Sequence, residues 1–193
     1  MINIKDWKDF QISEIYPYIE RPKSRSKRKY ESGKIPFIAS GSFNNGVDAY
    51  LAPTSPEDID QGDCLTLSPV DASCFYQEKP FLGRGGGGSS ILILRSDKKL
   101  SPNCHLFLAT VIRIRLQEQY SFNTMGNSSE IKHITIKLPV DSSKEPDWEY
   151  MDSYIKKLAT KSRSKISSLS IEKHLTSKND WVYSKANRPN FKI

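Results

Sequence analysis

The sequence predicts a mixed α/β (α+β) protein, in which a globular domain with a mixed, strongly bent sheet is followed by a long C-terminal helix. Short apolar segments, several with period-two alternation, recur between residues 35 and 140 and are typical of strands. From residue 146, apolar residues recur at three-, four- and seven-residue steps, which is typical of an amphipathic helix. We therefore expect a domain over residues 1–145, a helix over 146–178 and a tail over 179–193.

Composition favours a globular protein with a polyanionic partner. The 193 residues are 37% hydrophobic and 26% charged, which is enough to bury a core. No apolar stretch is long enough to span a bilayer and the N-terminus lacks a signal-peptide core, so we expect a cytoplasmic protein. Three scattered cysteines argue against a disulfide framework, and the neighbours Cys104 and His105 favour packing over a metal site. The net charge is +7.

The first segments predict a short strand or helical turn over residues 7–19, followed by a basic loop. Residues 21–29 contain no acid and have no apolar periodicity, so we expect a mobile loop. It is either a solvated stretch or an arm that follows a phosphate backbone. Its basic residues are Arg21, Lys23, Arg25, Lys27, Arg28 and Lys29.

Residues 35–51 predict two strands joined by a tight turn. The segment 35–39 is strand-like, and Pro36 favours an edge or a strand start. Alternation over 47–51 indicates a second strand, and Asn45-Gly46 is a turn signal. The turn is also rich in side chains that can hydrogen-bond to base edges. These are Ser40, Ser42, Asn44 and Asn45.

The next segments predict an acidic loop and a hairpin. Asp58, Asp60 and Asp63 faintly resemble a calcium loop, but the glycine is misplaced and no glutamate closes it. Residues 64–70 and 74–77 indicate two strands around a turn. A second set of base-reading candidates lies at the end of this hairpin and just after it, and consists of Tyr76, Gln77 and Lys79.

Residues 81–94 contain four consecutive glycines before the strand-like run ILIL. A phosphate-binding P-loop would need a lysine, and a dinucleotide fingerprint would need a following helix, so both are excluded. The run is either a flexible surface loop or a loop against a DNA backbone. In the second interpretation Arg84, Ser89 and Ser90 are donors.

The remaining elements are two helices and a strand. Residues 106–120 favour a helix whose first half lies in the core, and residues 130–140 favour a strand that includes His133. Pro146 and Asp147 are good starts for the final helix. Its apolar stripe needs to be covered by its own domain or by a second chain. The stripe consists of Trp148, Met151, Ile155, Leu158, Ile166 and Leu169.

No catalytic constellation is visible, which favours a binding module over an enzyme. There is no nucleophile elbow, and neither the glycine motif nor the catalytic loop of a DNA methyltransferase is present. A less favoured alternative is a small magnesium-dependent nuclease that uses Asp58, Asp60 and Asp63.

A series of segments resembles the target recognition domain of type I restriction-modification specificity subunits over about residues 7–160. The segments are WKDFQISEIY, GKIPFIASG, NNGVDAYL, GDCLTLSPVDASCFYQEKPFL, YSFNTMGN, IKLPV and PDWEYMDSYI. The resemblance implies a non-catalytic, double-stranded-DNA-reading domain followed by a spacer helix. It also implies a methyltransferase partner that uses S-adenosylmethionine and, in many systems, an ATP-driven, magnesium-dependent restriction subunit.

A full-length specificity subunit has two recognition domains, whereas this chain has one. The resemblance therefore implies a half-subunit that pairs through its helix as a homodimer and reads a symmetric split site. The alternative within the same family is a truncated protein that binds the methyltransferase without reading DNA.

Overall fold

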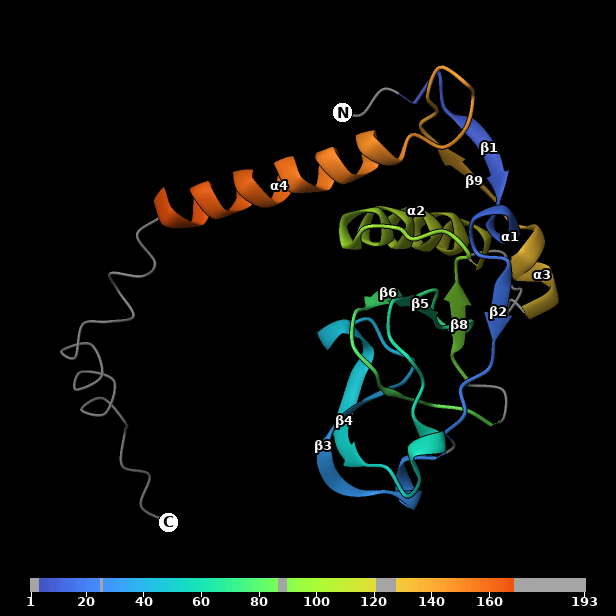
Figure 1. Ribbon diagram of the computed structural model, residues 1–193, viewed down its shortest axis with the longest axis vertical. Helices are drawn as coiled ribbons and strands as arrows, with labels where there is room; N and C mark the ends of the chain where they lie inside the picture. Colours follow the sequence, from blue (N-terminus) through green and yellow to red (C-terminus); the bar gives the residue numbers. More distant parts are fainter. Residues whose placement is uncertain (1–3, 25, 87–89, 121–127, 169–193) are drawn as a thin grey trace, which may run out of the picture. The chain divides into compact units, whose positions relative to one another are not determined.

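The computed structural model describes residues 4–24, 26–86, 90–120 and 128–168 (Figure 1). The strands are β1 (Lys8–Gln11), β2 (Tyr18–Glu20), β3 (Glu31–Ile38), β4 (Val47–Ala52), β5 (Cys64–Leu67), β6 (Cys74–Gln77), β7 (Leu82–Gly83), β8 (Leu92–Arg95) and β9 (Thr135–Leu138). The α-helices are α1 (Ile12–Ile15), α2 (Pro102–Tyr120), α3 (Ser128–His133) and α4 (Trp148–Ser168), and short 3₁₀ helices are η1 (Lys27–Lys29), η2 (Asn44–Gly46) and η3 (Pro56–Asp58).

The strands form three sheets, with orders β1-β9, β2-β8-β5-β6 and β4-β3-β7. All neighbouring strands are antiparallel except β3 and β7, which pair in parallel through Phe37 and Leu82. The predicted mixed α/β class is confirmed, and the strands are divided over three sheets rather than gathered in one bent sheet. The predicted hairpins β3–β4 and β5–β6 are both present.

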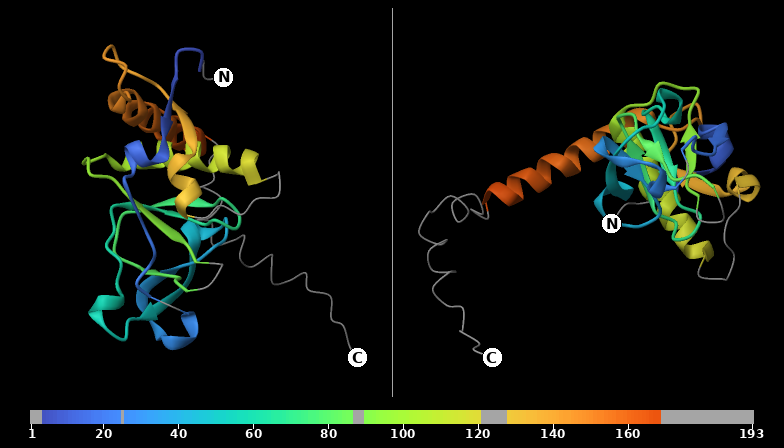
Figure 2. Two further views of the ribbon diagram at one scale, coloured as in Figure 1. Left: turned by 90° about the vertical axis from the view of Figure 1, so that its right-hand side faces the viewer. Right: turned by 90° about the horizontal axis from the view of Figure 1, so that it is seen from below.

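Helix α2 packs on the four-stranded sheet and forms the largest part of the core (Figures 1 and 2). Leu108, Ile112 and Leu116 are fully buried at four-residue steps, so one face of the helix is apolar throughout. They belong to the same core cluster as Leu65 and Leu94 of the sheet. The helix predicted over residues 106–120 is confirmed, and it begins four residues earlier, at Pro102.

The strand predicted over residues 130–140 is wrong in its first part. Helix α3 ends at His133, and strand β9 begins only at Thr135. Ile131 and Ile134 are both buried at a three-residue spacing, which suits a helical turn, whereas alternation begins after Ile134. His133 is exposed at the end of α3, where its Nδ1 lies 3.3 Å from Oε1 of Gln11.

Helix α4 begins at Trp148, two residues after the predicted start at Pro146. The side chain of Asp147 accepts a hydrogen bond of 2.8 Å from the backbone N–H of Tyr150, as a helix N-cap does. In the predicted stripe, Met151 is fully buried, and Trp148 and Ile155 pack against the main core. Leu169 and the rest of the helix predicted to reach residue 178 lie outside the described residues.

The chain divides into two units, residues 1–155 and 156–193, with the division inside α4. In the second unit, Leu158 and Ile166 of the stripe are exposed, with relative accessibilities of 43% and 54%. No helix in the described part of the chain is long and apolar enough to cross a membrane.

Candidate nucleic-acid interface

The β3–β4 hairpin has one buried face and one exposed face. Phe37 and Leu51 are buried in a small apolar cluster, whereas Asp48 and Tyr50 are exposed on strand β4. The prediction that Pro36 marks an edge strand or a strand start is wrong, because β3 begins at Glu31 and lies between β4 and β7. Strand β7 pairs only with residues after Pro36, so the missing backbone N–H of the proline leaves no gap in that pairing.

The tight turn predicted between these strands is confirmed. Asn44, Asn45 and Gly46 all have positive φ, at 48°, 55° and 78°. The backbone N–H of Gly46 donates to the carbonyl of Phe43 at 2.9 Å, and Ala39 N–H donates to the carbonyl of Gly46 at 2.9 Å. Asparagine and glycine tolerate this left-handed backbone better than other residues, which explains their place here.

Both asparagine side chains are turned back onto the protein. The amide nitrogen of Asn45 donates to the carbonyl of Tyr76 at 3.1 Å and to Oε1 of Gln77 at 3.3 Å. The amide nitrogen of Asn44 lies 3.3 Å from the carbonyl of Val47. Asn45 thus fixes the turn to strand β6, and Asn44 contacts the first residue of strand β4, so both asparagines help to shape the turn.

Gln77 is buried and completes this anchor. Only 6% of the residue is accessible, and its amide nitrogen donates to the carbonyl of Asn45 at 3.1 Å and to the Thr66 hydroxyl at 3.0 Å. Its Oε1 accepts from Asn45. All of these hydrogen bonds are internal, so the structure gives Gln77 a supporting position rather than the predicted base-reading one.

One of the side chains that the turn presents to solvent was not indicated by the sequence. Ser42 is exposed, Ser40 is half-buried, and Phe43 has a relative accessibility of 85%. Sequence reasoning missed Phe43. The available signal was an aromatic residue in the middle of an otherwise polar turn.

The basic segment is anchored at its first half. Pro22 and Ser24 are buried, and the hydroxyl of Ser24 donates to the carbonyl of Gly83. The carboxylate of Asp60 accepts from the backbone N–H groups of Lys23 and Gly83, each at 3.2 Å. Burial raises the pKa of Asp60, although the two hydrogen bonds oppose that shift.

This anchor explains Gly83 and the first glycine of the four-glycine run, Gly85. A Cβ at Gly83 would lie 2.6 Å from Cβ of Pro22, and one at Gly85 would overlap the carbonyl oxygen of Ser24. Glycine is therefore needed at both positions for the basic segment to approach. The predicted donor Ser90 is buried and donates to the carbonyl of Arg84 at 3.2 Å, and Ser89 lies outside the described residues.

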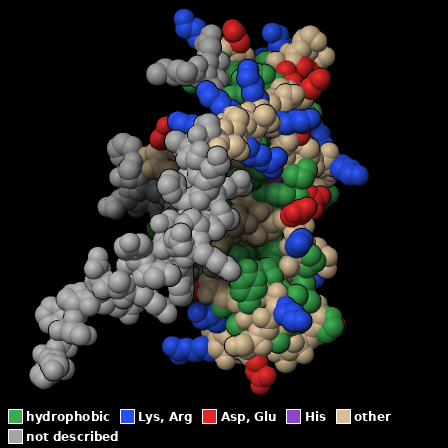
Figure 3. All heavy atoms as spheres, turned by 90° about the vertical axis from the view of Figure 1, so that its left-hand side faces the viewer, with side chains coloured by type: hydrophobic (Ala, Val, Ile, Leu, Met, Phe, Trp, Pro, Cys, Tyr) green, Lys and Arg blue, Asp and Glu red, His purple; other side chains and the backbone are tan. Residues whose placement is uncertain are grey.

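Beyond the anchor, the cationic side chains are exposed. Lys27 Nζ forms an ion pair of 2.9 Å with Asp48 of strand β4, which ties helix η1 to the hairpin. Arg25 lies outside the described residues. The exposed predicted cations are Arg21, Lys23, Lys27, Arg28, Lys29, Lys79 and Arg84. In Figure 3, exposed hydrophobic side chains lie among Lys and Arg side chains on one face of the molecule.

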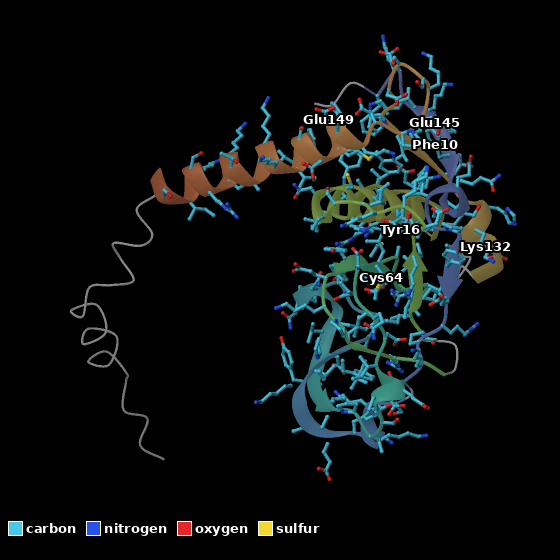
Figure 4. All side chains as sticks on the ribbon, viewed as in Figure 1. Phe10, Tyr16, Cys64, Lys132, Glu145 and Glu149 are labelled. Carbon is cyan, nitrogen blue, oxygen red and sulfur yellow. The ribbon has the colours of Figure 1, made fainter. Side chains whose placement is uncertain are left out.

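Tyr76 is held by a network around the buried His105. The two rings stack with centroids 4.7 Å apart, and the Tyr76 hydroxyl donates to Asp63 at 3.1 Å. His105 Nε2 lies 3.4 Å from Asp63, and its Nδ1 lies 2.8 Å from the hydroxyl of Tyr16, a buried residue labelled in Figure 4. Burial lowers the pKa of His105 against the attraction of Asp63. Burial, helped by the bond to Asp63, raises the pKa of Tyr76 to about 12.

The three acids of the alternative nuclease site make separate contacts. Asp58 accepts from the backbone N–H of Ser55, Asp60 holds the basic segment, and Asp63 faces Tyr76 and His105. No group of three potential metal ligands occurs among the residues that the structure describes.

Comparison with known proteins identifies the family. The family model described as "Type I restriction modification DNA specificity domain" matches residues 4–168. The chain belongs to this family. The match confirms the resemblance seen in the sequence. It extends over the globular domain and over helix α4 to Ser168, the last residue of the described helix.

This specificity domain is similar to relatives about twice its length. It is 26% identical over 161 residues to the type II restriction enzyme BgcI specificity subunit S.BcgI of Heyndrickxia coagulans, covering 82% of this chain and 45% of that protein. The crystal structure of an HsdS subunit from Thermoanaerobacter tengcongensis matches 99% of this chain and 47% of its own, with a TM-score of 0.56 and 14% identity. The crystal structure of an S subunit from M. genitalium matches 89% of this chain and 44% of its own, with a TM-score of 0.51 and 14% identity.

These structures share the fold of this specificity domain. The chain spans less than half the length of the relatives that it matches.

Proposed function

We propose that the chain is a sequence-specific, double-stranded-DNA recognition module that directs a restriction-modification methyltransferase to its target. Membership of the specificity-domain family carries this proposal. The exposed cations of residues 21–29 support it, because lysine and arginine next to phosphates provide salt-dependent affinity.

The arrangement of the hairpin gives the proposal a physical basis. Helix η1 is tied to strand β4 by Lys27 and Asp48, so part of the basic segment lies beside the anchored turn. Phosphate contacts from the segment would set the position of the protein on the duplex, and side chains of the turn would reach base edges. Positioning and readout would then come from the basic segment and from the hairpin that follows it.

The proposed role is non-catalytic. Asp58, Asp60 and Asp63 already hold a turn, the basic segment and the His105 network, so each has a structural use that needs no ligand. S-adenosylmethionine, ATP and magnesium would be bound by partner subunits, namely a methyltransferase and, where present, a restriction subunit.

The proposed assembly is a homodimer formed through helix α4. Leu158 and Ile166 are exposed eight residues apart, so they lie on the same side of the helix. A second copy of the helix would cover them, and two recognition domains would then read a symmetric split site.

Selection from a random duplex pool at near-physiological salt tests the proposal. The full chain is used alone and together with its co-expressed methyltransferase. Enrichment of a split or palindromic sequence is the expected result, and its symmetry reports whether one or two copies bind. Enrichment of no sequence in either format, with the methyltransferase still co-purifying, would instead favour a partner-binding protein that does not read DNA.

A further inference from the structure

The anchored turn of the β3–β4 hairpin exposes an aromatic ring that neither the core nor the turn needs. Phe43 has a relative accessibility of 85%, the highest among the exposed large hydrophobic residues of the described chain. A single exposed hydrophobic residue carries little meaning by itself. Its backbone setting is what distinguishes Phe43.

The backbone that follows the ring is fixed. The carbonyl of Phe43 accepts from Gly46, and the side chain of Asn45 holds the turn to strand β6. Beneath the turn there is little free space, because a Cβ at Gly46 would lie 3.2 Å from Cγ2 of Ile38. The ring is therefore held outward on a pre-formed turn, so ordering the loop adds little entropic cost to a contact made there.

The surroundings of the turn indicate which partner the ring contacts. Asn45 joins it to the end of strand β6, which leads to the exposed Lys79. Lys27 is ion-paired to Asp48 at the start of strand β4, next to the exposed Arg28 and Lys29 of η1. An aromatic ring on a turn that is linked to two segments with exposed cations suits a duplex, which offers both phosphates and base pairs.

We infer that Phe43 is a specificity-determining residue that packs against the apolar surface of base pairs in the recognised duplex. This inference rests on the proposed function and adds an apolar contact that the hydrogen-bonding side chains do not provide. The contact is made either with the C5-methyl group of thymine or with the face of a base at an opened step.

The test compares the full-length wild type with Phe43→Ala in the random-duplex selection. Phe43→Leu is a conservative variant, and Tyr18→Ala is the matched control, because Tyr18 is 55% exposed on strand β2 of another sheet. Phe43→Ala is expected to lose preference at one or two adjacent positions and to bind the wild-type duplex about tenfold more weakly. For Phe43→Ala, the affinity for a scrambled duplex and the salt dependence of binding stay unchanged. Tyr18→Ala binds every duplex as the wild type does. Phe43→Leu has an affinity and a sequence preference between those of the wild type and Phe43→Ala.

Two modified duplexes identify the contacted surface. Replacing thymine by deoxyuridine at the affected positions removes only the methyl group, and it should weaken wild type but not Phe43→Ala if the ring packs on that methyl. If the ring instead opens the step, a 2-aminopurine placed there should become more fluorescent when the wild type binds, but not when Phe43→Ala binds.

Three results would overturn the inference while leaving the proposed function intact. Phe43→Ala could select the wild-type sequence with unchanged affinity, or lose affinity for selected and scrambled duplexes alike. It could also keep its sequence preference but fail to co-purify with the methyltransferase. By contrast, failure of the wild type to select any sequence would contradict the proposed function itself.

Discussion

Replacing Gln77 with alanine should destabilise the fold rather than simply relax base preference. The side chain is buried and makes three hydrogen bonds, at 3.1 Å and 3.3 Å with Asn45 and at 3.0 Å with Thr66. At about 1 kcal/mol for each hydrogen bond, the expected loss in the free energy of unfolding is about 3 kcal/mol. With a urea m-value of about 2 kcal/mol/M, the unfolding midpoint falls by about 1.5 M.

Urea unfolding followed by tryptophan fluorescence measures this loss, since Trp7 and Trp148 both pack against the main core. Lys79→Ala is the matched control, because Lys79 is exposed two residues further along the chain and should change stability by no more than about 0.5 kcal/mol. An unchanged urea midpoint for Gln77→Ala, together with lost preference at one base, would refute the reasoning and restore Gln77 as a direct reader.

Three further predictions concern the buried histidine, the glycine-rich run and the basic segment. Burial lowers the pKa of His105 in the folded state, so the unfolded state binds the proton more readily. The stabilising contribution of the neutral ring is therefore fully present above pH about 6.5 and is lost as the pH falls below that value. Thermal unfolding from pH 7.5 to 5.5 should show a smaller loss of stability in His105→Gln than in the wild type. A stability that is independent of pH in the wild type over this range would contradict that assignment. Gly85→Ala places a methyl group against the carbonyl of Ser24 and should lower stability by about 1–3 kcal/mol in a thermal melt; an unchanged melting temperature would show that the basic segment does not need this close approach. Arg28→Ala should weaken binding to all duplexes alike and reduce the salt slope by about 0.9, whereas the exposed Lys132 of α3 should be replaceable by alanine without effect, so a sequence-dependent loss at Arg28 would argue against a phosphate contact.

Local signals in the sequence predicted most of the elements. A short apolar run located the second half of strand β3, alternating polarity located strand β4, and Asn45-Gly46 located the turn between them. Asp147 located the start of α4. These signals act between residues close together in the chain, which is why they can be read without the fold.

The site depended on contacts that no local pattern records. Asn45 bonds to the carbonyl of Tyr76, 31 residues away, and Ser24 bonds to the carbonyl of Gly83, 59 residues away. Because of the first contact, Asn45, which the sequence predicted to read bases, anchors the turn. The second contact belongs to a close approach of the basic segment that makes glycine necessary at Gly83 and Gly85. From the sequence alone, this region could equally have been a surface loop. The exposure of Phe43 could likewise be read only from the folded chain.

The central claim is that this specificity domain distinguishes one duplex sequence from others. The most direct measurement is a competition titration at about 0.15 M salt, comparing the dissociation constants for the selected duplex and for a scrambled duplex of the same composition. We predict a ratio of about 10³ or more, as found for sequence-specific proteins. A ratio near one, with the methyltransferase present as well as absent, would contradict the account.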